Sequence, residues 1–231
     1  MELPVFYFDK PVYADILTLD EDTSRHVVQV LRMKPYENLQ LTDGQGNLLE
    51  AQIVDDHKKR CTVKITGRRV IAKKEQRVSI AISLVKNVSR FEWFLEKATE
   101  VGVTEIIPLI CERTEKQYFR YDRMKQIVVS AMMQSKQAWL PLLREPSAIN
   151  TIIPSLEYNT RLIAHCEDGI KTSIADFRKQ PSVQVFIGPE GDFTPQEIST
   201  LLDSNFLPVS LGANRLRTET AGVVAATVLC I

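Results

Sequence analysis

The sequence has no excess of either charge and no long hydrophobic run. Its 231 residues include 29 lysines and arginines and 29 aspartates and glutamates, so the formal net charge is zero. A neutral chain creates no overall field that attracts nucleic acid, and such a partner must meet a local patch. No apolar run approaches membrane length, and residues 1–10 lack the basic start and apolar core of a signal peptide. We therefore expect a soluble, cytoplasmic protein.

Cysteine and the common catalytic motifs are also scarce. The four cysteines are far apart and do not cluster with the three histidines, which argues against a zinc site or a disulfide framework, so we expect no metal. There is no G-x-x-x-x-G-K-[ST] loop, no strand-linked G-x-G-x-x-G, no G-x-S-x-G elbow and no H-E-x-x-H. These absences exclude several standard hydrolase, dinucleotide-binding and metalloprotease sites.

The first part of the chain reads as a small, mostly β domain. Short alternating runs continue to about residue 71, and Asp43-Gly44-Gln45-Gly46 predicts the turn of a hairpin. One helical segment is expected at 23–31, capped by Asp22 or Thr23. His26 lies in this segment, and we leave open whether it packs against the domain or contacts a partner.

After residue 76, strand-like runs alternate with helical ones. This alternation predicts an α/β domain with a largely parallel sheet and helices on both faces. Its first helix carries apolar residues at helical spacing from Phe91 to Val101, and Gly102 can end it. We place the domain boundary at a charged connector, giving domains 1–72 and 73–231.

Two loops at strand ends are the strongest candidates for a site. The stretch VQVFIGPEGDFTPQEI, residues 183–198, is a buried strand followed by Gly-Pro-Glu-Gly, and then a helix whose capping box runs from Thr194 to Glu197. Ligands bind beyond the carboxyl ends of strands in open α/β sheets, and glycine lets them approach the backbone. The alternative is a tight turn without a ligand.

The second loop, 211–221, places charged residues at the start of the last helix. Thr218 or Thr220 can cap this helix, and Glu219 meets the positive end of its dipole, so a purely structural role stays open for them. An arginine at a helix N-terminus is electrostatically unfavourable. Arg217 is therefore the better candidate for function.

A basic run, HKKRCTVKITGRRVIAKK, occupies residues 57–74 and contains no acidic residue. Its one-sided charge indicates either an anionic partner or a solvated pair of strands.

Together these motifs resemble a known family. GPEG followed by F-T-x-x-E-I, then LGxxxLRTETA, with RFEWFLEKATEVGV upstream and HVVQVLRM near the start, is similar to the ribosomal RNA small subunit methyltransferase E family. The match runs in the same order over nearly the whole chain. The resemblance implies a SPOUT-type C-terminal domain with a deep trefoil knot, a PUA-like β-barrel before it, and a homodimer. It also implies S-adenosylmethionine-dependent methylation of N3 of a uridine in 16S rRNA, on naked RNA or the small ribosomal subunit.

The resemblance also transfers site residues by position. It implies a donor pocket from both loops: Ile187, Gly188, Pro189, Glu190, Gly191, Leu211, Gly212, Asn214, Leu216 and Arg217. The chain departs from the family's common GPEGG at Asp192, and its upstream arginine, Arg215, is shifted by one position.

Uridine N3 must lose a proton before it can attack, so the site needs a base or a cation that stabilises the uridine anion. We assign this cationic role to Arg217, with Arg215 as a helper and Glu219 as an orienting carboxylate. RNA contacts are expected from basic residues: Arg25, Arg32, Lys58, Lys59, Arg60, Arg68, Arg69, Lys86, Arg90 and Arg113. The alternatives are a non-catalytic RNA-binding assembly factor with this fold and an α/β transferase or hydrolase with Glu190 as base.

Overall fold

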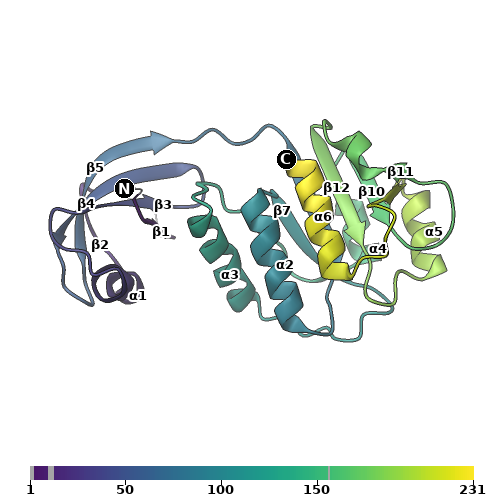
Figure 1. Cartoon of the computed structure of the whole chain (residues 1–231), viewed down its shortest axis with the longest axis horizontal. Helices are drawn as coiled ribbons and strands as arrows, with labels where there is room; N and C mark the ends of the chain where they lie inside the picture. The colour runs from purple at the N-terminus through teal and green to yellow at the C-terminus, as the bar shows by residue number, and fades with distance from the viewer. Residues whose placement is uncertain (1–2, 10–12, 156) are drawn as a thin grey trace. The chain divides into compact units, whose positions relative to one another are not determined.

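The structure, a computed structural model, describes residues 3–9, 13–155 and 157–231 (Figure 1). The chain divides into two compact units, residues 1–73 with 132–140, and residues 74–131 with 141–231. The sequence did not predict that 132–140 belong with the first unit. Long-range hydrogen bonds explain this assignment, because Gly46 N–H donates to Ala138 O at 2.8 Å and Trp139 Nε1 donates to Ile71 O at 2.9 Å.

The first unit is built on a curled sheet in the order β1-β3-β4-β5-β2. Its core includes Leu39, Leu41 and Val63, which are fully buried. The hairpin expected at 43–46 is confirmed, since β3 and β4 pair antiparallel. Within the described residues the sheet ends at β1 and β2, so it forms a half-barrel. Its elements are β1 (Val5–Tyr7), β2 (Ile16–Thr18), α1 (Glu21–Arg25), η1 (His26–Val30), β3 (Asn38–Thr42), β4 (Asn47–Asp55) and β5 (Thr62–Val70).

The expected 23–31 helix is wrong in its start and in its type. Asp20 is the N-cap, because its carboxylate accepts the Thr23 N–H at 2.9 Å, and helix α1 is followed directly by the π-helix η1. The His26 ring lies edge-on to Phe6, with centroids 5.6 Å apart. The His26 ring therefore packs against Phe6 within the small domain.

The second unit carries a parallel sheet in the order β11-β13-β10-β12-β6-β7-β8, and β9 also pairs with β7. Its strands are β6 (Arg77–Ser83), β7 (Glu105–Ile110), β8 (Leu142–Leu143), β9 (Ser147–Ala148), β10 (Thr160–Ala164), β11 (Thr172–Ser173), β12 (Ser182–Ile187) and β13 (Leu207–Ser210). The expected alternation of strands and helices is confirmed.

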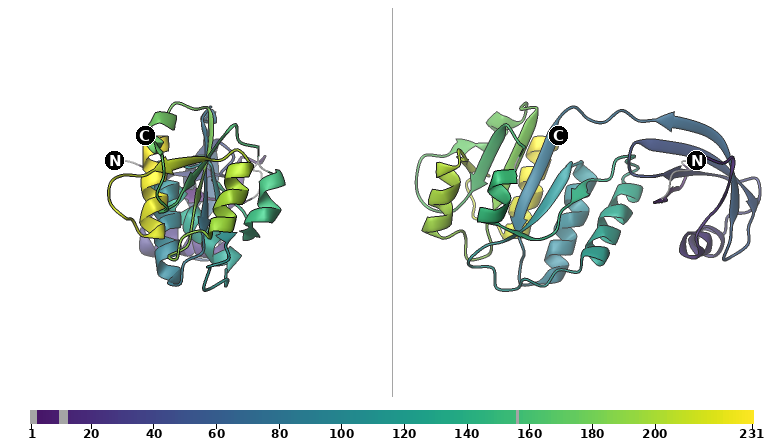
Figure 2. Two further views of the ribbon diagram at one scale, coloured as in Figure 1. Left: turned by 90° about the vertical axis from the view of Figure 1, so that its right-hand side faces the viewer. Right: turned by 180° about the vertical axis from the view of Figure 1, so that it is seen from behind.

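Helices cover both faces of this sheet (Figure 2). Helices α2 and α6 pack together on one face, and α5 lies on the other. Gly102 ends α2 in the left-handed conformation, with φ 94°, and the capping box at Thr194 is present, so both sequence predictions are confirmed. The helical elements are α2 (Val88–Val101), α3 (Tyr121–Gln134), α4 (Ile149–Ile152), η2 (Ile153–Ser155), η3 (Ile174–Phe177), α5 (Pro195–Asp203) and α6 (Thr218–Cys230).

None of the helices in the described part of the chain has both the length and the hydrophobicity needed to cross a bilayer.

Candidate active site

A cavity of about 760 Å³ opens at the carboxyl ends of three neighbouring strands, β12, β10 and β13. The ends of β10 and β12 are level, because Ala164 pairs with Ile187. Parallel strands place their following loops at one edge of the sheet, which is where open α/β sheets bind ligands. The volume lies within the range of small-molecule sites, about 300–1,000 Å³.

The structure brings together the two loops that the sequence singled out. All residues expected to bind the donor line the cavity except Gly191, namely Ile187, Gly188, Pro189, Glu190, Leu211, Gly212, Asn214, Leu216 and Arg217. Arg215 also lines it, whereas Glu219 does not. Gly191 lies beside Arg113, whose Nη1 donates to Gly191 O at 2.8 Å. Arg113 thus supports the Gly-Pro-Glu-Gly loop directly.

The two loops are joined by Thr218. Its buried hydroxyl donates to Gly188 O at 3.0 Å. The expectation that Thr218 or Thr220 caps α6 is therefore wrong: the N-cap is Arg217, which makes no side-chain capping bond. A buried hydroxyl needs a partner, and the carbonyl across the pocket supplies it.

Each loop uses glycine for a different reason. A Cβ on Gly188 would lie 3.0 Å from Phe193 N and 3.2 Å from Asp192 Oδ1, so close packing excludes a side chain. Gly212 has φ 141°, a conformation open to glycine, and nothing stands within 4 Å of its Cβ position. Bare backbone is therefore open at Gly212, whereas the close packing at Gly188 holds the Gly-Pro-Glu-Gly loop in place.

A third wall, which the sequence reasoning missed, comes from the segment after β10. Ala164, His165, Cys166 and Lys171 line the cavity. Burial and the nearby Lys171 ammonium lower the pKa of His165, which favours the neutral imidazole. The same argument from strand ends would have found this segment, since the run RLIAHC ends there.

Asp192 ties this third wall to the Gly-Pro-Glu-Gly loop. It has φ 63°, and its two carboxylate oxygens accept the Cys166 N–H at 2.7 Å and the Phe193 N–H at 2.8 Å. Aspartate tolerates the left-handed conformation better than most side chains because it is short and polar. Asp192 thus links the ends of two neighbouring strands, β10 and β12.

Replacing Asp192 should separate the strain at this position from its hydrogen bonds. Asp192→Gly removes both bonds without strain, and we expect a loss of about 1–2 kcal/mol in the free energy of unfolding for this half-exposed group. Asp192→Asn keeps one acceptor oxygen, so its free energy of unfolding should fall less than that of Asp192→Gly. Asp192→Ala adds left-handed strain of about 1–2 kcal/mol and should lose most. Urea titrations give the order, and an alanine variant as stable as the glycine variant would contradict it.

Glu219 occupies an unusual environment in the first turn of α6. Its side chain is buried, Arg90 Nε lies 3.7 Å from Oε1, and Oε2 has no hydrogen-bond partner among the described residues. A buried carboxylate with one weak partner is costly, which favours a role beyond packing.

Several of the basic candidates have acidic partners, and those of the basic run lie outside that run. Arg25 and Lys59 pair with Glu21, and the other pairs are Arg68–Asp15, Arg69–Glu50 and Lys86–Glu115. Arg32, Lys58 and Arg60 have no ion pair within the described ranges. Exposed pairs of this kind are weak, about 0–1 kcal/mol, and can be exchanged for phosphate contacts.

Two of the cysteines, Cys61 and Cys111, are buried in the cores of the two units. Burial raises the pKa of Cys111 to about 12 and that of Cys61 to about 11, so neither is a thiolate at neutral pH. Within residues 3–9, 13–155 and 157–231, no group of three or more histidine, cysteine, aspartate or glutamate side chains is arranged to hold a metal ion.

Comparison with known proteins agrees with this architecture. Residues 72–230 match the family model described as an RNA methyltransferase domain, and residues 19–66 match that of an RNA methyltransferase PUA domain. The ribosomal RNA small subunit methyltransferase E of Synechocystis sp. is 30% identical over 221 residues, covering 90% of this chain and 71% of that protein.

Solved structures show the same fold over both units. A crystallised protein of Porphyromonas gingivalis is 38% identical, with a TM-score of 0.90 over 97% of this chain and 95% of its own. The ribosomal RNA small subunit methyltransferase E of Neisseria gonorrhoeae, crystallised with S-adenosyl methionine, is 28% identical, with a TM-score of 0.87 over 97% and 95% of the two chains. The α/β methyltransferase domain and the preceding PUA domain are thereby confirmed, while the SPOUT type and the knot stay predictions of the resemblance. The chain belongs to the ribosomal RNA small subunit methyltransferase E family of RNA methyltransferases.

Proposed function

We propose that this chain transfers a methyl group from S-adenosylmethionine to N3 of a uridine in 16S rRNA, with the RNA presented alone or in the small ribosomal subunit. The observation that carries the proposal is the cavity at the ends of β12, β10 and β13, walled by two glycine-containing loops. The Neisseria relative, crystallised with the same methyl donor, supports this choice of ligand.

The residues present fit this donor. The bare backbone at Gly212 can meet its polar groups, and Ile187, Leu211 and Leu216 offer apolar surface to the adenosyl part. Glu190 is held near the cavity by the Lys86 N–H, which donates to its Oε1 at 3.0 Å. The donor supplies an activated methyl group, so the protein has to orient the reactants and stabilise charge.

The cationic side chains at the cavity provide that charge stabilisation. Arg217 and Arg215 both line it and are exposed, with room to reach an incoming base. We assign Arg217 to the uridine anion that forms when N3 loses its proton, because a guanidinium can hold a carbonyl oxygen that gains negative charge. Arg215 helps from the same loop.

Glu219 lies outside the cavity, so we propose that it acts through Arg90. The carboxylate would hold this guanidinium at the start of α2, where it contacts RNA. Glu219 is then a positioning residue.

The RNA is held by the small domain, residues 1–72, and the methyl transfer takes place on residues 73–231. The basic side chains of the first domain, together with Lys86 and Arg90, supply phosphate contacts. Arg113 serves the site through the loop that it supports. We place the enzyme in the cytoplasm, where its RNA is made.

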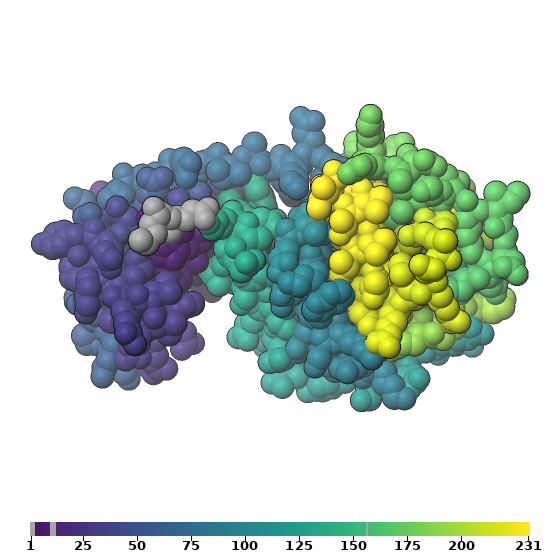
Figure 3. Space-filling view, viewed as in Figure 1, coloured from purple at the N-terminus to yellow at the C-terminus, as the bar shows by residue number. Residues whose placement is uncertain are grey.

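We further propose a homodimer. Helix α6 is apolar on nearly all sides, which is typical of a helix buried in an assembly. It lies on the surface of its unit beside α2 (Figure 3), with Val223, Val224 and Val228 half-exposed. A second copy could cover this face, and sedimentation equilibrium tests it.

Calorimetric titration with S-adenosylmethionine, together with methylation of unmodified small subunits, tests the activity. We expect saturable binding and a methyl group at uridine N3, located by mass spectrometry of the digested RNA. Gly188→Trp should abolish binding because the side chain collides with Phe193 and Asp192 and displaces the loop that walls the cavity, whereas Ile170→Trp, at an exposed position outside the cavity, should not. Failure to bind the donor with RNA present would contradict the proposal. A methyl group found on another atom would contradict the assignment of N3 as the methylated position.

A further inference from the structure

The end of η1 and the loop between η1 and β3 expose large apolar side chains. Tyr36 is 82% exposed, Val30 67% and Leu31 44%. Arg32 and Tyr36 both have left-handed backbones, with φ of 56° and 74°. An aromatic residue rarely takes this conformation, and such strained positions concentrate at functional sites.

The loop is nevertheless firmly held. Its buried Met33 donates its N–H to Val27 O at 3.0 Å, and the Tyr36 N–H donates to Ile53 O at 2.9 Å. Gln52 Nε2 donates to Tyr36 O at 3.1 Å. The ring is therefore presented to solvent from a fixed backbone.

A polar row lies on the sheet beside this loop. Asn38, Gln52 and Lys64 are in register across β3, β4 and β5. The neighbouring positions Leu39 and Ala51 point into the core, and side chains alternate along a strand, so this row faces outward. Gln52 contacts Tyr36 directly through its hydrogen bond, Asn38 follows two residues after Tyr36, and Lys64 continues the same row on β5.

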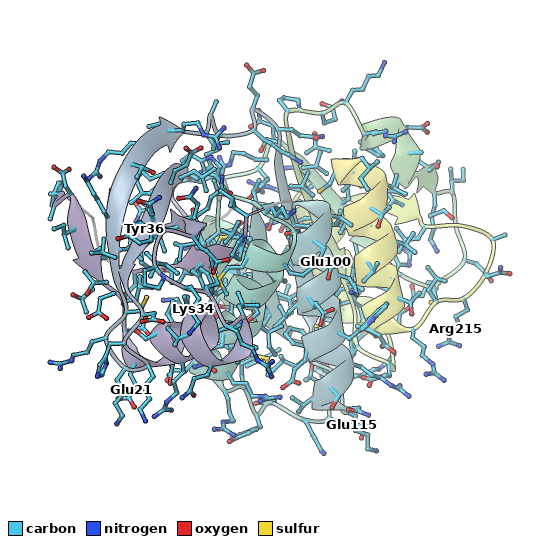
Figure 4. All side chains as sticks on the ribbon, turned by 60° about the vertical axis from the view of Figure 1, so that its left-hand side comes forward. Glu21, Lys34, Tyr36, Glu100, Glu115 and Arg215 are labelled. Atoms are coloured by element: carbon cyan, nitrogen blue, oxygen red, sulfur yellow. The ribbon has the colours of Figure 1, made fainter. Side chains whose placement is uncertain are left out.

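Two cationic side chains, Arg32 in the loop and Lys64 in the polar row, can meet an anionic partner. The side chains of Arg32 and Lys64 have no hydrogen bond or ion pair within the described part of the chain. Lys34 is paired with Asp56 at 3.4 Å, and Glu37 accepts the Lys34 N–H. The two free cations therefore remain for phosphate. Figure 4 labels Lys34 and Tyr36 on the small unit.

We propose that this loop binds an unpaired nucleotide of the RNA substrate, with Tyr36 stacking on the base. Arg32 and Lys64 contact the flanking phosphates, and the amides of Asn38 and Gln52 hydrogen-bond the base edge. Unpaired bases are bound in this way, by aromatic faces flanked by cations and amides. The proposal rests on the proposed function for the identity of the ligand as RNA.

Fluorescence anisotropy with a labelled single-stranded RNA of about 12 nucleotides tests this site in the full-length chain. Tyr36→Phe keeps the ring and should bind within about twofold of the original protein. Tyr36→Gly should weaken binding about 5- to 150-fold, the range for one lost base stack. Glycine also relieves the left-handed strain, so its Tm should not fall. A purely structural tyrosine would instead show loss of stability.

Salt titrations separate stacking from phosphate contact. Arg32→Ala and Lys64→Ala should each reduce the slope of log affinity against log salt by about 0.7, and Tyr36→Gly should leave the slope unchanged. Tyr118→Ala, an exposed tyrosine of the other unit, is the matched control and should bind normally.

Three outcomes would overturn the site: full affinity in Tyr36→Gly, equal binding of a duplex of the same sequence, or an equal loss in Tyr118→Ala. If Tyr36→Gly instead reduced self-association in sedimentation, the loop would be a contact between copies. Donor titration is run in parallel on the same samples. A protein that binds RNA through Tyr36 but never binds the donor would refute the proposed function and leave this site standing.

Discussion

Arg217→Ser is expected to lower the rate of methyl transfer by about 10²- to 10³-fold, the usual cost of removing one donor to developing negative charge. The stability of the fold should not decrease. Arg217 is the N-cap of α6 and makes no capping bond, and its positive charge opposes the helix dipole. Serine at an N-cap stabilises a helix by about 1 kcal/mol, so activity and stability should change in opposite directions.

Single-turnover methylation of unmodified small subunits measures the rate, and thermal unfolding measures the stability. Calorimetric titration should show donor affinity changed only a few-fold, because backbone groups carry most of the proposed donor contacts. Arg215→Ser is the matched control, two positions upstream on the same loop (Figure 4), and should lose less than about tenfold. Near-normal turnover in Arg217→Ser, or an equal loss in both variants, would refute the assignment.

Local patterns predicted much of the fold. The capping box at Thr194, the C-terminal Gly102 and the 43–46 hairpin each depend on residues close in sequence, and all three were correct. The two candidate loops also came together, because parallel strands send their following loops to one edge of the sheet.

Long-range hydrogen bonds explain what the sequence could not predict. Thr218 has the sequence position of a cap, but the Gly188 carbonyl, 30 residues away, captures its hydroxyl. From the sequence, Asp192 is only a residue in a turn. Its hydrogen bond with the Cys166 N–H depends on β10 and β12 being neighbours in the sheet, which the sequence does not show. Similarly, the basic run contains no acidic residue, but Asp15 and Glu50, which lie elsewhere in the sequence, form ion pairs with Arg68 and Arg69.

Gly222→Leu should be the most destabilising of the substitutions considered. A Cβ at this position would lie 2.6 Å from Phe94 Cε2 and 2.8 Å from Ile82 Cδ1, and both of those side chains are fully buried. Helix propensity alone predicts that Gly222→Ala stabilises α6 by about 1 kcal/mol. Overpacking typically costs about 1–3 kcal/mol, so we expect a net loss for alanine and a loss above about 3 kcal/mol for leucine.

Whether Gly222→Ala raises or lowers the free energy of unfolding decides between helix propensity and overpacking. Urea unfolding with an unchanged m-value measures this change. Phe94→Leu should open space between α2 and α6, because the Phe94 ring supplies the two closest contacts. The double variant Gly222→Ala with Phe94→Leu should therefore lose less stability than the sum of the two single changes. If alanine alone stabilised the protein, α2 and α6 would have to separate at little cost, and close packing of the two helices would not be the reason for glycine here.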